Sequence, residues 1–286
     1  MSLQNLTIRD AEHVTDPVTG RHVYHVKDPH ALVQAAGYLK HVRGRRNDEA
    51  VFFRGETRVY STLSPSLFRG LLSRKRQELR MGQLRKAIAD TAARNRVFSK
   101  MDVMVHEPLL QHYGIRTSWI DVVDNVWVAL WFACHKALTT GTVNQYLHFE
   151  QRTAAKDPGG YAYVLLIATD AIAQMNSPKG MIIGKASELV DLRIAAPSYF
   201  LRPHAQHGLL MRMRGQSGGR PLDYAAQIRG IIRINLGDAL EWLGQGKMLG
   251  VHALFPPPFY DKGYGVLLQS GFPESMVLGA ISHVGT

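Results

Sequence analysis

Residues 126–133, with the sequence VWVALWFA, are apolar on every side, and this segment constrains the fold most strongly. A surface helix keeps one polar face, whereas a helix that is apolar all round has to be enclosed by the rest of the protein. We therefore expect a central, buried helix over residues 125–138. Cys134, the single cysteine, lies in this stretch and is expected to be a small buried apolar side chain.

Short apolar runs predict the strands that surround this helix. The run at residues 51–54 is rich in Val and Phe, and the runs at residues 161–168 and 231–236 also predict strands. With 286 residues, of which 45% are hydrophobic, the chain can bury a sizeable core. The predicted fold class is α+β, a single domain with a central, mostly antiparallel sheet flanked by helices.

Helices are expected between these strands. Residues 29–41 are a plausible helix, and Asp238 is a candidate N-cap for a helix over residues 239–243. Residues 1–28 are polar and are expected to form an N-terminal extension with weak structure of its own. The domain would then span residues 29–286 and include a basic helical segment at residues 69–100.

Positive charge is concentrated in that basic segment. The chain carries 34 Lys and Arg against 23 Asp and Glu, a net charge of +11. Residues 69–100 hold ten of the cations and two of the anions, so this segment contributes +8. Such a stripe is typical of a nucleic-acid-binding surface, although a solvated helix face or an acidic protein partner would also account for it. The candidate nucleic-acid-binding residues are Arg74, Lys75, Arg76, Arg80, Arg85 and Lys86.

The sequence shows no sign of a disulfide-bonded, metal-binding, secreted or membrane-spanning protein. One cysteine cannot form an internal disulfide or a cysteine-based zinc site. The thirteen histidines are scattered without ligand spacing, so no metal site is predicted. The N-terminus lacks the layout of a signal peptide, and no apolar run is long enough to span a membrane. We therefore expect a cytoplasmic protein that does not interact with a membrane.

Arg54 ends the apolar run at residues 51–54 and is followed by Gly55. A guanidinium at the end of a strand can leave the core and offer two parallel hydrogen bonds to an anion. Gly55 allows backbone or ligand to approach closely. A salt bridge at the strand terminus is the alternative explanation for Arg54, and local sequence does not separate the two.

The strongest constellation of candidate functional residues is spread over three blocks. They are FRGE at 53–56 with LSPSLFR at 63–69, LQHYGIRTSWID at 110–121 followed by ALWFA at 129–133, and YFLRP at 199–203 with AQHG at 205–208. In this order and spacing they closely resemble the FRG domain, a bacterial and phage family named after its Phe-Arg-Gly motif. The resemblance covers most of residues 45–270. The chain differs where SWID, residues 118–121, replaces a more typical Arg-Leu-Leu-Asp, but Asp121 is kept.

The chain also resembles toxin-type ADP-ribosyltransferases, which have an Arg on the first core strand and a Ser/Thr strand leading into a helix. This resemblance implies an ADP-ribosyltransferase-like fold and NAD as a substrate. Arg54 would hold the pyrophosphate, and Thr117 and His112 would position the ribose and base. The implied catalytic residues are Arg54, His112, Thr117, Asp121 and Gln206, and the implied NAD-binding residues are Arg54, Gly55, Gln111, Tyr113, Thr117 and Arg202.

A catalytic glutamate is expected in such enzymes, but Gln206 occupies the corresponding region. Glutamine can hydrogen-bond a ribose hydroxyl but supplies no negative charge. Glu56 or Asp121 could replace it, or His112 could act as a base. Each residue also has a structural explanation: Asp121 could cap the following helix, and His112 and Tyr113 could be satisfied core groups.

The leading hypothesis from sequence is an NAD-dependent ADP-ribosyltransferase-like enzyme that modifies RNA or DNA, in a toxin–antitoxin or phage-defence setting. A toxin of this kind would have a neutralising antitoxin or chaperone protein as a partner. Two alternatives stay open. One is a non-catalytic module that binds or senses nucleic acid, and the other is a metal-independent nuclease or phosphotransferase that uses His112 and Arg54.

Overall fold

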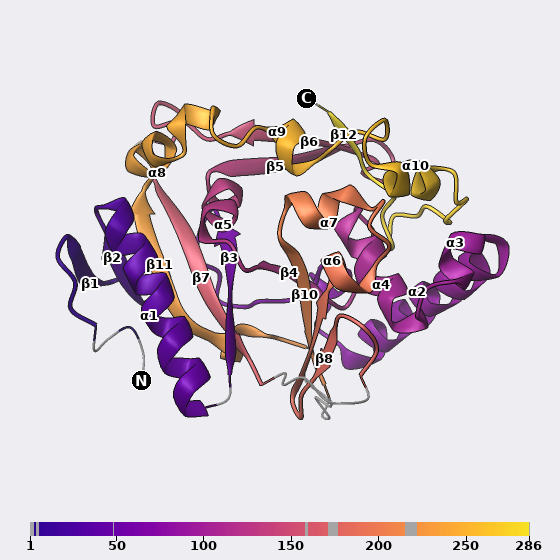
Figure 1. Cartoon of the computed structure of the whole chain (residues 1–286), viewed down its shortest axis with the longest axis horizontal. Coiled ribbons are helices and arrows are strands. Elements are labelled where there is room, and N and C mark those ends of the chain that lie inside the picture. Colours follow the sequence, from indigo (N-terminus) through magenta and orange to yellow (C-terminus); the bar gives the residue numbers. More distant parts are fainter. Residues whose placement is uncertain are drawn as a thin grey trace.

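A computed structural model describes residue 3 and residues 6–47, 49–157, 160–170, 177–214 and 222–285, without the side chains of residues 44–47. Within these ranges the larger sheet has nine strands in the order β1-β2-β11-β7-β3-β4-β10-β9-β8 (Figure 1). Its strands are β1 (Ala11–Thr15), β2 (His22–Val26), β3 (Ala50–Glu56), β4 (Ile120–Val123), β7 (Tyr161–Thr169), β8 (Met181–Ile183), β9 (Ser187–Asp191), β10 (Gly208–Met213) and β11 (Ile228–Asn235).

Antiparallel pairing dominates this sheet, because β2 and β11 are parallel and the other neighbouring strands of the described sheet are antiparallel. The expected central, mostly antiparallel sheet is therefore confirmed. A smaller sheet, in the order β12-β6-β5, consists of β5 (His135–Thr140), β6 (Tyr146–Gln151) and β12 (His283–Gly285). It crosses the top of the molecule in Figure 1.

Ten α-helices are present in the described part of the chain. None of them is long and apolar enough to cross a membrane, as far as the described residues extend. The helices are α1 (Pro29–Asn47), α2 (Arg74–Arg94), α3 (Arg96–Ser99), α4 (Val103–His112), α5 (Val126–Ala133), α6 (Leu192–Ala195), α7 (Leu201–Ala205), α8 (Leu236–Trp242), α9 (Val251–Leu254) and α10 (Lys262–Leu268).

The nine-stranded sheet is nearly split between β3 and β4. β3 pairs with β7 from Ala50 to Glu56, but it pairs with β4 only where Phe53 faces Val123. On one side of this split, α1 and α5 pack on β3, and on the other side α6 and α7 pack on β10 (Figure 1). Each half has an apolar cluster of its own, and a third cluster spans the split, since it includes Leu165 of β7 and Leu209 of β10.

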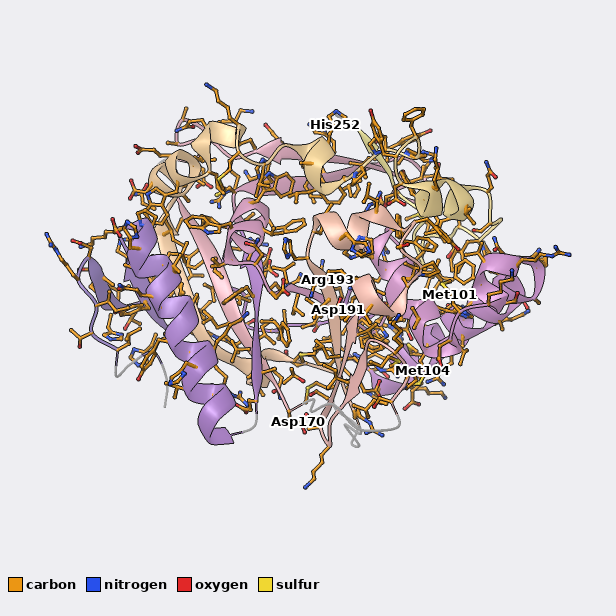
Figure 2. All side chains as sticks on the ribbon, viewed as in Figure 1. Met101, Met104, Asp170, Asp191, Arg193 and His252 are labelled. Atoms are coloured by element: carbon orange, nitrogen blue, oxygen red, sulfur yellow. The ribbon has the colours of Figure 1, made fainter. Side chains whose placement is uncertain are left out.

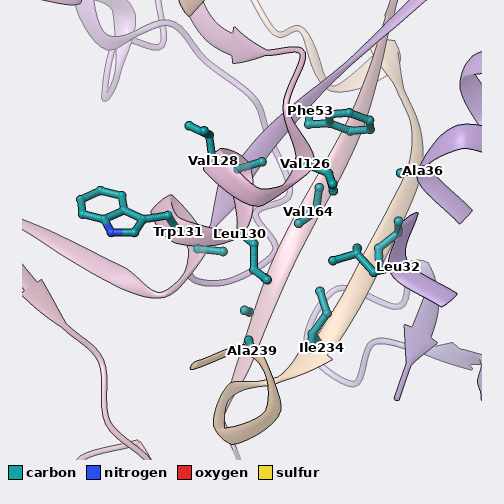
Figure 3. Packing of buried hydrophobic residues seen from close by; sticks show 14 of the residues in the cluster. Leu32, Ala36, Phe53, Val126, Val128, Leu130, Trp131, Val164, Ile234 and Ala239 are labelled. Carbon is teal, nitrogen blue, oxygen red and sulfur yellow. The ribbon is translucent and has the colours of Figure 1, made fainter. Parts of the chain in front are cut away.

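Helix α5 is buried in the first of these clusters, as its sequence predicts. Leu130 and Trp131 are fully buried; Leu130 points toward β7, whereas Trp131 points away from that strand (Figure 3) and lies against Phe149 and Phe255. The Trp131 ring nitrogen donates a hydrogen bond to the carbonyl of Leu249, 2.8 Å away, so the one polar atom of this side chain is satisfied. Burial of such a side chain stabilises the fold by roughly 1.5–3 kcal/mol.

The helix is shorter than the expected residues 125–138. It ends at Ala133, and the chain continues as β5, which pairs with β6 from His135 to Thr140. Asn125 caps the helix, because its side chain accepts hydrogen bonds from the amides of Trp127 and Val128. Asp121 is therefore not the cap of this helix.

The N-terminal extension contributes more structure than expected. β1 and β2 form a hairpin, and β2 extends the large sheet by pairing with β11. Tyr24 and Val26 are buried in the core. The expectation of weak structure was therefore wrong for residues 11–26. β2 is stabilised by pairing with β11, and local sequence does not reveal this pairing because β11 lies some 200 residues later in the chain.

Two helix boundaries also differ from expectation. α8 begins at Leu236, and its N-cap is Asn235, whose side chain accepts a hydrogen bond from the amide of Gly237 at 2.9 Å. Asp238 was the wrong choice for the cap, because it lies in the first turn. The basic segment divides at Asn95 into α2 and α3.

Gly55 should not tolerate a side chain, because a Cβ atom there would lie 1.8 Å from the carbonyl oxygen of Ala129 in α5. We expect Gly55→Ala to lower the free energy of unfolding by about 3 kcal/mol, at the upper end for overpacking. Gly37→Ala in α1 is the matched control, since a Cβ there meets nothing within 4 Å. It should raise stability by about 0.5–1 kcal/mol. Urea unfolding followed by circular dichroism measures both, and equal stability of the two variants would contradict the close contact.

Candidate functional site

A cavity of about 480 Å³ lies at the split between β3 and β4. Its walls come from both strands, from the β5–β6 hairpin, from the C-terminal end of α4, and from α7 and the residues that follow it. This volume is within the usual range of small-molecule sites. Seven of the residues predicted from sequence line it: Arg54, Gly55, Gln111, His112, Asp121, Arg202 and Gln206.

Arg54 bridges the split in the sheet. Its Nε donates a hydrogen bond to Glu56 at 2.7 Å, and its Nη1 donates one to the backbone carbonyl of Asp121 on β4, also at 2.7 Å. Burial alone would lower the pKa of the Arg54 guanidinium, but the charges of Glu56 and Asp121 reverse this and raise it. The side chain is 17% exposed. Arg54 is therefore a cation that joins two strands and also faces the cavity.

The Asp121 carboxylate is held in place by a chain of hydrogen bonds. Gln111 Nε2 donates to Asp121 Oδ2 at 2.8 Å, and the hydroxyl of Thr117 donates to Gln111 Oε1. Burial would raise the pKa of Asp121, but the adjacent His112 ring, the charge of Arg54 and the hydrogen bond from Gln111 hold that pKa below its usual value. The Asp121 side chain is 48% exposed. It therefore presents an ionised carboxylate to the cavity.

His112 lies beneath this carboxylate. Its Nδ1 is 3.7 Å from Asp121 Oδ1, and its side chain is 4% exposed. Its Nε2 is buried and has no hydrogen-bond partner among the described residues. A Cβ at Gly208 would come within 2.8 Å of this nitrogen, so a glycine is needed at position 208 to leave room for the ring.

Arg202 forms the inner end of the cavity. Its guanidinium lies over the rings of Tyr113 and Tyr264, at 4.3 and 4.6 Å from their centroids. One nitrogen donates to the carbonyl of His112 at 3.1 Å, whereas Nε and Nη2 have no partner in the described part of the chain. Burial lowers the pKa of this guanidinium. Cation–π contacts of this kind stabilise a desolvated arginine by roughly 2 kcal/mol.

Two predicted site residues do not line the cavity. Thr117 is fully buried and acts on the site through Gln111. Tyr113 is also fully buried, and its hydroxyl donates a hydrogen bond to Asp261 at 2.7 Å. Burial raises the pKa of Tyr113. Tyr113 is thus a satisfied core group, which was the structural explanation considered for it.

The remaining wall was not predicted as part of a site. The β5–β6 hairpin brings Lys136 and Phe149 to the cavity, and Phe255 lies against Phe149 with ring centroids 4.5 Å apart. Phe132 of α5 also lines the cavity. Phe132 belongs to the ALWFA segment singled out in the sequence, but Phe149 and Phe255 stand in no motif, and only the folded chain brings the three rings together. Gln206 donates its amide to the carbonyl of Leu254, next to Phe255, at 2.7 Å.

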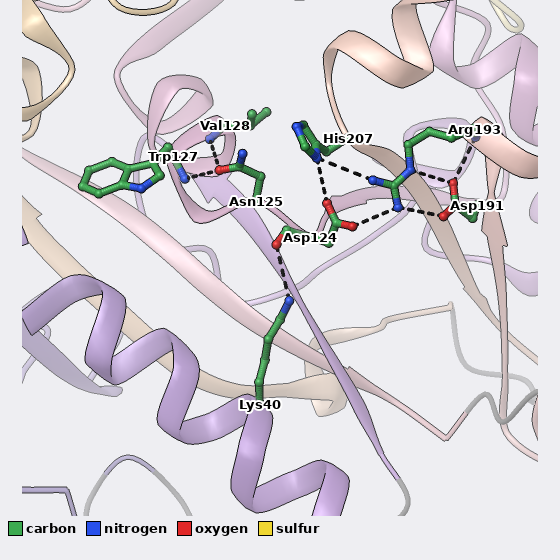
Figure 4. A network of polar contacts seen from close by, with 8 residues as sticks. All are labelled: Lys40, Asp124, Asn125, Trp127, Val128, Asp191, Arg193 and His207. Atoms are coloured by element: carbon green, nitrogen blue, oxygen red, sulfur yellow. Dashed lines mark hydrogen bonds and ion pairs between the residues drawn. The ribbon is translucent and has the colours of Figure 1, made fainter. Parts of the chain in front are cut away.

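A second polar cluster lies beside the cavity, at the end of β4. Asp124 accepts hydrogen bonds from Arg193 at 2.8 Å and interacts with Nδ1 of His207 at 3.1 Å (Figure 4). Arg193 also pairs with Asp191, and both residues lie near the middle of the molecule in Figure 2. Lys40 donates to the backbone carbonyl of Asp124 at 3.3 Å. The cluster ties α1, β4 and α6 together, because its bonds join all three.

The predicted nucleic-acid-binding residues lie along α2. Lys75, Arg76, Arg85 and Lys86 are exposed, whereas Arg74 and Arg80 are half-buried. Arg80 donates a hydrogen bond to the carbonyl of Leu67 at 2.9 Å, so part of its guanidinium has a structural role. The helix lies at the side of the molecule that is marked by Met101 and Met104 in Figure 2.

Comparison with known protein families identifies one match. Residues 49–141 match the FRG domain. The matched segment runs from β3 to the end of β5 and contains Arg54, Gln111, His112 and Asp121. It therefore supports the resemblance to the FRG family for the first two of the three blocks. No curated protein and no solved structure matches the chain significantly.

The lowered pKa of Asp121 makes stability depend on pH. An aspartate whose pKa is lower in the folded state than in the unfolded chain, where it is about 3.9, stabilises the fold when ionised. This contribution is present above pH 4 and is lost as the pH falls through the pKa of the folded state. We expect Asp121→Asn to be less stable than the wild type at pH 7, and the difference to shrink between pH 4 and pH 2.

Chemical unfolding at each pH measures this difference. Glu241→Gln on α8 is the control, because Glu241 is exposed. A difference between Asp121→Asn and the wild type that stays constant or grows on acidification would show that the carboxylate is not stabilised in its ionised form.

Proposed function

We propose that the cavity binds NAD and that the protein transfers ADP-ribose from NAD to a nucleic acid. The observation that carries the proposal is the ionised, half-exposed carboxylate of Asp121, held by Gln111 next to Arg54. Aromatic side chains from α5 and β6 face the same space. An aromatic wall beside a fixed carboxylate suits a flat heterocycle joined to a ribose.

The reaction breaks the glycosidic bond between nicotinamide and the ribose, and nicotinamide leaves with the bonding electrons. Positive charge then develops on the ribose, as in glycoside hydrolysis. A carboxylate that is already oriented stabilises this charge without reorganising. Asp121 would fill this role, and the nucleophile of the acceptor would form the new bond to the ribose carbon. Glu56 would accept the proton that the nucleophile loses.

This assignment supplies the negative charge that a catalytic glutamate would provide and that Gln206 cannot provide. Glu56 and Asp121 both line the cavity, and both belong to the part of the chain that matches the FRG domain. A carboxylate is therefore supplied from β3 or β4, next to Arg54, rather than from the region of Gln206. Gln206 donates its amide to the backbone and would shape the cavity.

Arg54 would contact the pyrophosphate with the part of its guanidinium that stays free. Nε and Nη1 are engaged with Glu56 and with the Asp121 carbonyl, which leaves Nη2 to face the ligand. Arg69 and Lys136 also line the cavity and add positive charge for the two phosphates. The exposed cations of α2 would hold the nucleic-acid acceptor.

A metal-independent nuclease is a second candidate, and the unpartnered Nε2 of His112 favours it. A histidine paired with an aspartate can act as a general base on a nucleic-acid hydroxyl. This reaction would need no NAD. It predicts strand cleavage, whereas the leading proposal predicts nicotinamide release and an intact, modified strand.

Asp121→Asn should lower the rate of nicotinamide release by about 100-fold, because the variant removes the charge that opposes the developing cation. The binding of NAD should change little, since the shape of the side chain is kept. Chromatography of NAD incubated with the protein, with and without RNA or DNA, measures the rate. Glu241→Gln is the control and should retain wild-type turnover.

The same incubations separate the alternatives. Cleavage of the strand without loss of NAD would replace the proposal by the nuclease. Strand binding with neither reaction would favour a non-catalytic nucleic-acid-binding module. Wild-type turnover in Asp121→Asn would leave the transfer reaction standing but contradict the role of Asp121.

A further inference from the structure

We propose that a second pocket, between α2 and β10, is a phosphate subsite for a nucleic-acid strand; this inference rests on the proposal that the protein acts on nucleic acid. The pocket has a volume of about 280 Å³ and is separate from the central cavity. Four arginines line it: Arg74 and Arg85 from α2, Arg212 from β10, and Arg214 directly after β10.

One face of α2 forms a wall of this pocket. The lining residues are three or four positions from at least one other member of the set, which places them on the same side of a helix: Arg74, Gln77, Glu78, Met81 and Arg85. The opposite wall comes from β9 and β10. Gln77 is buried and accepts a hydrogen bond from the amide of Leu222 at 3.2 Å, so the pocket is fixed to the body of the protein.

The two arginines from the sheet side are largely neutralised. Arg212 pairs with Glu188 at 2.5 Å, and Arg214 pairs with the other oxygen of the same carboxylate at 3.3 Å. Arg212 also lies 3.6 Å from Glu107 and stacks over the ring of Trp119. These contacts hold both guanidinium groups in place, and they leave little charge on this wall for a ligand.

The two arginines of α2 keep donors that the described residues do not satisfy. Arg74 Nε pairs with Glu78 at 3.3 Å, but Arg74 Nη1 is buried and has no hydrogen-bond partner in the described part of the chain. Arg85 is exposed and forms no ion pair within the same ranges. A buried, unsatisfied donor costs roughly 1–3 kcal/mol, and a charged one more. An anion beside Arg74 would remove that cost, and Arg85, about 16 Å further along the helix axis, can contact another phosphate of the same strand.

A phosphodiester is the anion that best fits this position. Lys75 and Lys86 are exposed on the flank of the same helix, roughly a third of a turn round from the residues that line the pocket. A nucleic-acid strand carries a charge at every nucleotide and can contact the pocket and these neighbours together. An isolated phosphate could bind only in the pocket.

Fluorescence anisotropy with a labelled 12-nucleotide single strand of RNA, and with the same sequence in DNA, tests the subsite over a range of salt concentrations. Arg85→Gln should weaken binding about tenfold and reduce the dependence of affinity on salt by about one charge. Arg96→Gln on α3 is the matched control, with the same loss of charge at an exposed position outside the pocket. It should weaken binding less than threefold.

Equal effects of Arg85→Gln and Arg96→Gln would overturn the subsite, because they would show that only the total charge matters. Binding of inorganic phosphate in the pocket without an effect of Arg85→Gln on the strand would also overturn it. NAD turnover measured without nucleic acid is independent of this pocket. Loss of strand binding in Arg85→Gln would therefore support the subsite even if NAD were not consumed, whereas unchanged strand binding with normal NAD turnover would reject the subsite alone.

Discussion

The hydrogen bond between the Arg54 guanidinium and the backbone carbonyl of Asp121 joins two strands that otherwise meet at a single pair of residues. A gap in a sheet exposes backbone groups that need partners, and a buried cation needs an anion. Arg54 meets both needs, since it donates to the backbone of β4 and pairs with Glu56. The cavity exists because β3 and β4 separate beyond this pair, and the Arg54 hydrogen bond fixes the position of β4 relative to β3.

Three consecutive residues of the Phe-Arg-Gly motif serve three different purposes in this structure. Phe53 is buried in the core at the one point where β3 pairs with β4. Arg54 crosses the gap, and Gly55 lets α5 approach the strand so closely that a side chain would collide with Ala129. The motif is therefore explained first by the architecture of the split sheet. The same architecture also brings Asp121 and Glu56 to the cavity.

The sequence predicted those parts of the site that lie in compact motifs. Arg54, Gln111, His112 and Asp121 come together as expected, because each is fixed by the element that carries it. Residue type alone did not reveal that Thr117 acts through Gln111, since this depends on a hydrogen bond between buried side chains. The aromatic wall was missed in part because residues 135–138, which begin β5, were expected to continue the buried helix. β2 was missed because its partner strand is far away in sequence, and local patterns carry no information about such pairing.

A crystal structure with a non-hydrolysable NAD analogue, in which a carbocycle replaces the nicotinamide ribose, tests the central claim most directly. The account predicts the analogue in the cavity between β3, β4 and the β5–β6 hairpin, with the carboxylate of Asp121 next to the carbocycle and Arg54 still bonded to the Asp121 carbonyl. An empty cavity at millimolar analogue, or an analogue bound elsewhere on the protein, would contradict it.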